Sequence, residues 1–149
     1  ARGGLVNVEV KGDAPEREPV VRALHTLLAR RPPRARDACL LSTFDPLLFV
    51  MLRRALPATP CGFLFDTDNT RPIRARFARV ALRPHGLHPE HVLAPDRAIR
   101  RWRRRGAFVN VWTVDGPDRA AALARAGADG IITNEPGAIL AAVAGSQAP

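Results

Sequence analysis

Lysine is almost absent from this chain. Of its 23 basic residues, only Lys11 is a lysine and the rest are arginines. The chain is also rich in alanine and proline, which is typical of a GC-biased coding sequence, so the net charge of +9 is weak evidence for an acidic partner. The same bias draws attention to Lys11, because it indicates a position where a guanidinium does not replace an ammonium.

Cysteines and long apolar runs are scarce as well. Cys39 and Cys61 begin apolar segments, where a free thiol packs as a small hydrophobe, and a disulfide between them is disfavoured. No Cys-x-x-Cys pair is present, which excludes a cysteine-cluster metal site. No apolar run is long enough to span a bilayer. A chain of 149 residues with 46% hydrophobic residues predicts one globular domain.

The first apolar segment, residues 5–11, alternates as a β-strand does. Its valines form one face, and Asn7, Glu9 and Lys11 form the other. Glu9 offers hard oxygens to a divalent cation, and Lys11 offers a compact charge to an anionic oxygen beside that cation. The alternative is a half-exposed antiparallel strand on which Glu9 and Lys11 are an ordinary surface pair.

The rest of the chain alternates between strand and helix patterns. Strands are predicted at 38–44, 61–65, 79–82, 108–114 and 129–133, and helices at 15–29, 47–56, 95–105, 117–126 and 136–144, with at most a short helix at 73–77. Short strand-helix units that repeat in this way are typical of a parallel α/β barrel. The sequence therefore predicts an incomplete parallel (β/α)8 (TIM-type) barrel over residues 1–145, with about six of the eight units and a frayed tail at 146–149.

Three polar segments suggest sites, but a simpler interpretation is favoured for each. The arginine-rich run 30–36 lacks interleaved aromatic residues, so it is interpreted as a solvated loop rather than a nucleic-acid patch. The acidic segment 66–69 lacks the glycine and the terminal glutamate of a calcium loop and is interpreted as a turn. Zinc ligation by His85, His88 and His91 would need a tight turn and a further ligand, so His88 and His91 are predicted to be loop and cap residues.

In a barrel of this type, functional side chains lie at the carboxyl ends of the strands. Polar or aromatic residues end strand after strand here, namely Glu9, Lys11, Ser42, Phe44, Asp45, Asp66, His85, Trp112 and Asn134. Asn110 is predicted to share a face with Trp112. The carboxyl ends of the strands surround one opening, the mouth of the barrel, and a site there needs polar or aromatic residues from several strands. This distribution favours a site that includes Glu9 and Lys11 over the surface-pair alternative.

Four motifs in order resemble the glycerophosphodiester phosphodiesterases: NVEVKG at 7–12, LSTFDP at 41–46, VNVWTV at 109–114 and ADGIITNEP at 128–136. The resemblance runs from about residue 5 to about residue 143. It implies a phospholipase-C-like barrel that hydrolyses glycerophosphodiesters to glycerol 3-phosphate and an alcohol with Ca²⁺ or Mg²⁺. By position, Glu9 resembles a metal-binding glutamate and Lys11 the lysine beside the phosphate, and Trp112 resembles an aromatic wall near the glycerol.

Phe44, Asn110 and His85 are further candidates for substrate contact. The family's His-Arg-Gly motif, its Glu-x-Asp metal pair and its second catalytic histidine have no counterpart here. With one metal ligand and no acid-base pair, we expect little activity from this chain alone. The alternatives are a catalytically dead partial barrel that binds glycerophosphate or a partner protein, and, less favoured, a nucleic-acid binder. Open barrel edges predict self-association or pairing with a missing amino-terminal segment.

Overall fold

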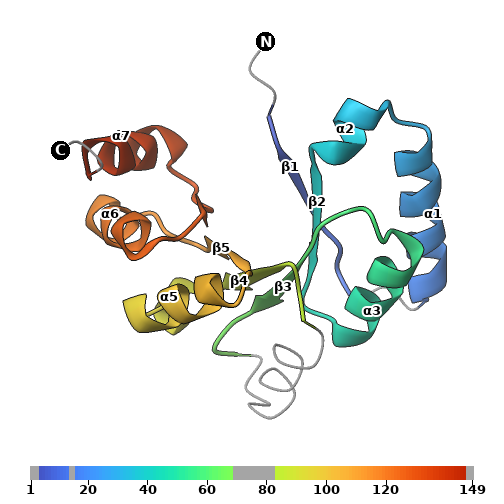
Figure 1. Cartoon of the computed structure of the whole chain (residues 1–149), viewed down its shortest axis with the longest axis horizontal. Helices are drawn as coiled ribbons and strands as arrows, with labels where there is room; N and C mark the ends of the chain where they lie inside the picture. The colour runs from blue at the N-terminus through green and yellow to red at the C-terminus, as the bar shows by residue number, and fades with distance from the viewer. Residues whose placement is uncertain (1–3, 14–15, 69–82, 147–149) are drawn as a thin grey trace.

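The computed structural model describes residues 4–13, 16–68 and 83–146. Six strands form one sheet in the order β1-β2-β3-β4-β5-β6, and every neighbouring pair is parallel. The strands are β1 (Val6–Glu9), β2 (Cys39–Thr43), β3 (Cys61–Phe65), β4 (Gly86–Pro89), β5 (Phe108–Val111) and β6 (Gly130–Ile131). The sheet is curled, as Figure 1 shows, and corresponds to an incomplete parallel α/β barrel.

Helices follow the strands and cover the outer side of the curled sheet (Figure 1). They are α1 (Arg17–Ala29), α2 (Pro33–Asp37), α3 (Pro46–Ala55), the 3₁₀ helix η1 (His91–Leu93), α5 (Asp96–Arg104), α6 (Pro117–Ala126) and α7 (Pro136–Ser146). Strand and helix alternate along the chain, which confirms the predicted fold class. Among the described residues, no helix has the length and apolar character needed to cross a membrane.

Local chemistry explains where these helices begin and end. Asp45 is the N-cap of α3, and its Oδ1 accepts hydrogen bonds from the amides of Leu47 and Leu48 at 2.8 and 3.0 Å. Pro46 follows at the first helical position, where its missing N–H costs nothing. Gly127 ends α6 with φ 96°, a left-handed conformation that favours glycine.

The main core lies between the outer face of the sheet and the helices. Val109 and Val111 of β5 are fully buried on this face, and Leu41 of β2 is 1% exposed. Ile99 of α5 and Leu123 of α6 belong to the same cluster and are also fully buried. Burial of these apolar side chains is the main stabilising contribution to the sheet.

The inner face of the sheet is polar and rich in glycine. Ser42 aligns with Gly62, Gly62 with Gly86, and Gly86 with Phe108. A Cβ added at Gly62 would collide with the His88 ring, and one added at Gly86 would collide with the Phe108 ring. These two glycines therefore make room for the large side chains that fill the interior from β4 and β5.

Three predictions about elements need correction or stay open. The arginine-rich run contains the short helix α2, because Pro33 starts a helical turn there. The fourth strand begins at Gly86, so His88 is a buried strand residue and not a loop or cap residue. The strand predicted at 79–82, the helix at 73–77 and most of the tail lie outside the described residues, although α7 extends to Ser146.

The two cysteines match their prediction. Both Cys39 and Cys61 are free thiols in the buried outer layer. Burial raises the pKa of the Cys61 thiol to about 12, against a smaller opposing effect of the charge on Arg53. The thiols therefore pack as small apolar groups and are unreactive in the folded chain.

Candidate functional site

The carboxyl ends of the six parallel strands define the mouth, the region where a site is expected in this architecture. Val10 is 5% exposed and belongs to the main core, so the flanking side chains of Glu9 and Lys11 lie on the opposite, inner side of the chain. Both are exposed and form no hydrogen bond or ion pair within the described residues. They are available to a ligand at the end of β1.

An aromatic pair forms one wall of the mouth. Phe44 follows β2 and Trp112 follows β5, and their rings meet edge to face with centroids 5.5 Å apart and an interplanar angle of 88°. The indole Nε1 of Trp112 donates a 2.7 Å hydrogen bond to the backbone oxygen of His88. The pair is therefore fixed both by its own contact and by β4.

Asp45 joins the first two strand ends. Arg17 donates from Nε to Asp45 Oδ2 at 2.7 Å, and a Cβ added at Gly12 would lie 2.8 Å from the same oxygen. Burial acts to raise the pKa of Asp45. Hydrogen bonds from the Leu48 amide and the Arg17 side chain, with the charge of Arg17, outweigh burial and hold that pKa below its usual value. Asp45 therefore stays ionised and has a structural role at the mouth.

Two other mouth carboxylates hold loops in place. Glu90 accepts hydrogen bonds from the backbone N and the hydroxyl of Thr67, both at 2.9 Å. Asp115 accepts from the Thr133 hydroxyl at 2.9 Å and from the backbone N of Asn134 at 2.8 Å. Hydrogen bonds from Asn134 and Thr133 lower the pKa of Asp115. Sequence reasoning missed Glu90, because the segment GLHP before it was not recognised as a strand.

Asn110 and Ser42 lie on the inner face of the sheet below the mouth, and Ser42 is in register with Phe108, two residues before Asn110. Asn110 Nδ2 lies 3.3 Å from His88 Nε2, and Asn110 Oδ1 would be 2.5 Å from a Cβ at Gly130. Ser42 and His88 are fully buried, and within the described residues Ser42 Oγ and His88 Nδ1 have no hydrogen-bond partner. Burial lowers the pKa of His88 to about 4, so the ring is neutral at physiological pH.

His85 does not lie at a strand end as predicted. It precedes β4, so it lies at the amino end of the sheet, opposite the mouth, and its Nδ1 accepts a 3.1 Å hydrogen bond from the backbone N of Cys61. His88 is in the interior and His91 is in η1 at the mouth end. The three histidines are thus spread along and beyond one strand, which does not suit shared zinc ligation.

The described residues do not by themselves fit a calcium or magnesium ion. No group of three or more His, Cys, Asp or Glu side chains in residues 4–13, 16–68 and 83–146 is arranged to hold a metal ion. Asp45 is already hydrogen-bonded to amides of α3 and to Arg17, and Glu90 and Asp115 are hydrogen-bonded to loops, as described above. Glu9 supplies one carboxylate at the end of β1, whereas hard cations of this kind take six or more oxygens.

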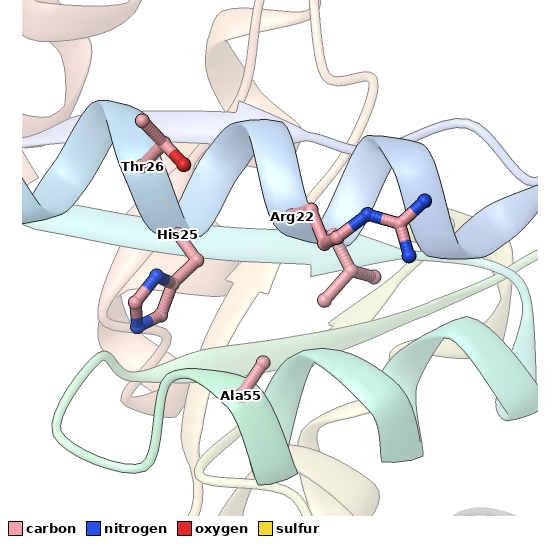
Figure 2. A pocket seen from close by; sticks show the side chains of 5 residues that line it. Arg22, His25, Thr26 and Ala55 are labelled. Atoms are coloured by element: carbon pink, nitrogen blue, oxygen red, sulfur yellow. The ribbon is translucent and has the colours of Figure 1, made fainter.

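A shallow groove of about 300 Å³ lies between α1 and α3, outside the sheet (Figure 2). It is lined by Val21, Arg22, His25, Thr26 and Ala55. Arg22 is already paired with Glu18 of the same helix at 3.3 Å. The groove belongs to the helical layer and is separate from the mouth.

Comparisons with known proteins agree on one family. The sequence profile described as the glycerophosphoryl diester phosphodiesterase family matches residues 5–138. A similar solved structure is a glycerophosphoryl diester phosphodiesterase from Silicibacter pomeroyi, with TM-score 0.83 and 22% identity, covering 95% of this chain and 50% of that one. A phosphodiesterase from Oleispira antarctica, in complex with the product sn-glycerol-3-phosphate, has TM-score 0.79 and 20% identity over 95% of this chain and 56% of its own.

A glycerophosphodiester phosphodiesterase from Parabacteroides distasonis has TM-score 0.76 and 19% identity, covering 95% of this chain and 58% of that one. The chain thus spans 50 to 58% of the length of these structures. No match was found among curated proteins. At these identities the structural likeness shows the fold, and the family profile carries the assignment.

Proposed function

Because this chain belongs to the glycerophosphoryl diester phosphodiesterase family, we propose that it supplies six β/α units of a barrel that hydrolyses glycerophosphodiesters to glycerol 3-phosphate and an alcohol. One observation carries the proposal. The Phe44–Trp112 wall lies at the same end of the sheet as the exposed, unpartnered side chains of Glu9 and Lys11. An apolar wall beside a cation and a carboxylate suits a ligand that has both a glycerol and a phosphate end.

Each of these residues has a proposed role. Lys11 binds a non-bridging phosphate oxygen and stabilises the negative charge that grows there during hydrolysis. Phe44 and Trp112 contact the carbon skeleton of the glycerol. Glu9 would be one ligand of a Ca²⁺ or Mg²⁺ ion, and its other ligands would have to come from outside the described residues. When bound, the ion would supply positive charge to the phosphate.

The chain alone is proposed to be a poor catalyst. Its four histidines are all described, and only His91 lies at the mouth end. His88 is buried and neutral, His85 lies at the opposite end of β4, and His25 is on α1. A general acid and base contribute about 10² to 10⁴-fold each to such reactions. Further β/α units, in the same chain or another, would have to provide them.

A second candidate is a partial barrel that binds glycerophosphate without turnover. The absence of a three-ligand metal group in the described residues favours it. Both candidates require the same phosphate and glycerol contacts, so they differ in catalysis and not in binding.

Calorimetry with glycerol 3-phosphate, with and without Ca²⁺ or Mg²⁺, tests the shared part. We expect weak binding, in the millimolar range, because one lysine and one aromatic wall replace a complete site. Turnover of glycerophosphocholine separates the two candidates, since the second predicts none above the uncatalysed rate. Absence of heat under every condition would contradict both.

A further inference from the structure

The two ends of the curled sheet carry opposite charges. At the mouth an acidic residue ends or follows every strand, namely Glu9, Asp45, Asp66, Glu90, Asp115 and Glu135. The other end, which we call the base, contains the starts of the strands and the connections that lead into them. Among the described residues the carboxylates of the base are Asp37 and Asp129, and Asp129 is paired with Arg103.

The first group of base arginines lies between α1 and β2. Arg30, Arg31, Arg34 and Arg36 are all exposed there, and none of their side chains forms an ion pair within the described residues. Figure 1 shows α2, which carries the last two, beside the amino ends of β1 and β2. The solvated loop expected from the sequence is therefore an ordered cluster of positive charge at the base.

A second group lies at the end of α5, just before β5. Arg101, Arg103 and Arg104 occupy its last turn and Arg105 is its C-cap, all of them exposed. Of these, only Arg103 has a carboxylate partner in the described part of the chain. Arg125 extends the positive surface to the last turn of α6.

The helix dipole explains only part of this arrangement. A basic residue in the last turn of a helix is favourable, as for Arg125 in α6. Several arginines at the end of one short helix repel one another, which is unfavourable for the isolated fold. A polyanionic surface against the base would remove that repulsion.

We propose that the base is a docking surface for an anionic phospholipid bilayer. The arginines lie in the connections that lead into β2, β5 and β6, and guanidinium groups dispersed in this way suit a plane of phosphates better than a single strand or groove. Leu27, which is 48% exposed one turn before Arg31, adds an apolar contact at the same end. No aromatic residue is among the exposed large hydrophobic residues described, so base stacking with single-stranded nucleic acid has no platform.

Docking through the base has a consequence for the site. Because the mouth lies at the opposite end of the strands, it faces the aqueous phase while the base contacts the lipid. Water-soluble glycerophosphodiesters would then reach the mouth without leaving solution. The proposal does not depend on the glycerophosphate site, since none of the base arginines lies at the mouth.

The test is sedimentation of the chain with vesicles of phosphatidylcholine alone or with about 30% phosphatidylserine, at about 0.1 M salt. We expect binding only to the anionic vesicles. A base variant combines Arg31→Gln, Arg34→Gln and Arg104→Gln, three exposed side chains with no partner in the described residues. Each arginine near an anionic surface contributes about fivefold to affinity, so the variant should bind about a hundredfold more weakly.

A control variant removes the same number of charges elsewhere on the helices, by Arg22→Gln, Arg97→Gln and Arg100→Gln. It should retain binding within a few-fold. Equal losses in the two variants, or no binding of the parent chain to anionic vesicles, would overturn the proposal. Tighter binding to a duplex DNA than to the vesicles, lost in the base variant, would assign the surface to nucleic acid instead. Circular dichroism melts check that both variants remain folded.

Discussion

The Phe44 and Trp112 rings touch although their strands are not neighbours. Strands β3 and β4 separate β2 from β5 in the sheet, yet the ring centroids are only 5.5 Å apart. In a flat sheet, strands three positions apart are about 14 Å from each other. The contact is therefore made across the interior of the curled sheet. The aromatic wall of the candidate site forms only because the sheet is curled.

Replacing Phe44 should affect ligand binding more than stability. Phe44→Ala removes an edge-to-face pair, which contributes about 1 kcal/mol beyond burial, and opens the proposed glycerol wall. We expect glycerol 3-phosphate affinity to fall several-fold in calorimetry. The matched control is Phe49→Ala, a 1% exposed residue that packs edge to face on Phe63 in the main core.

Phe49→Ala should reduce the free energy of unfolding by about 3 to 5 kcal/mol, as measured by urea denaturation, while the folded fraction binds normally. If both substitutions weaken binding equally after correction for folding, Phe44 has no specific role at the mouth.

The buried His88 predicts an acid-sensitive fold. Its pKa falls from 6.5 to about 4 on folding because burial disfavours the charged ring. The unfolded chain therefore binds a proton between these values when the folded chain does not, so stability falls as the pH decreases from 6.5 to about 4. The loss approaches about 3 kcal/mol at the end of this window. Urea denaturation at several pH values measures it.

The matched variants are His88→Gln and His25→Gln. His88→Gln keeps a hydrogen-bonding group beside Asn110 but cannot titrate, so the slope of stability between pH 6.5 and 4 should become shallower. His25 is exposed on α1, and His25→Gln should leave the slope as in the parent chain. An unchanged slope in His88→Gln would show that other groups cause the acid sensitivity.

The sequence was informative wherever periodicity and capping residues agree. Asp45-Pro46 and Gly127 fixed helix boundaries, because an N-cap oxygen and a left-handed glycine have few alternatives. The strand that contains His88 was missed, since the segment GLHP holds a glycine and a proline and reads as a turn. It is a strand because tertiary packing of Gly86 against Phe108 and burial of His88 outweigh local propensity.

The candidate site was harder to predict from the sequence, because the position of a side chain along the sheet depends on where its strand starts. Asn110 and Trp112 share a face, as predicted, but alternation alone does not indicate that Asn110 lies against His88 while Trp112 packs on Phe44. His85 was misplaced because the start of β4 was misplaced, which moved it from one end of the sheet to the other. The strands that lead to Phe44 and Trp112 consist of clear apolar runs, and the ends of these strands were predicted correctly.

Asp45 should contribute to stability in two separable ways. Asp45→Ala removes both the N-cap of α3 and the ion pair with Arg17, whereas Asp45→Asn retains a capping oxygen. We expect a loss of about 1 to 2 kcal/mol for alanine at pH 7 and a smaller loss for asparagine. Because the folded-state pKa of Asp45 is depressed, the advantage of aspartate over asparagine is present above the usual value of 3.8 and disappears as the pH falls through the lowered pKa.

Urea denaturation at pH 7 and near pH 3 checks this prediction. If the free energies of unfolding of the parent chain and of Asp45→Asn differ as much near pH 3 as at pH 7, the ionic contribution is contradicted. The control is Asp96→Asn, whose ion pair with Arg100 is exposed and should contribute little at either pH.

The open edge of β1 should make the chain associate. Leu5 and Val6 are 84% and 58% exposed, and β1 has a described strand on one side only. Unpaired edges with apolar side chains pair with other chains. Light scattering should therefore give a mass above that of a monomer, and Val6→Lys should lower it. A monomeric parent chain with a sharp cooperative melt would contradict this.

Lys11 gives the most direct test of the proposed phosphate contact. If Lys11 acts as a compact point charge, Lys11→Arg keeps the charge but places a planar guanidinium with different donor directions at the mouth. We expect Lys11→Arg to weaken glycerol 3-phosphate binding nearly as much as Lys11→Ala. In a chain provided with the remaining barrel units, turnover of glycerophosphocholine should follow the same ranking. Glu9→Gln should also reduce activity there, and added Ca²⁺ should restore part of it.

The matched control for Lys11 is Arg17→Lys, which changes the same two residue types in the opposite direction at a nearby position that holds Asp45 and not the ligand. It should alter stability slightly and leave glycerol 3-phosphate affinity within about twofold, since one paired cation replaces another. If Lys11→Arg retains most of the affinity while Lys11→Ala loses it, charge alone matters at this position. If neither substitution changes affinity, Lys11 is a solvated side chain and the phosphate binds elsewhere.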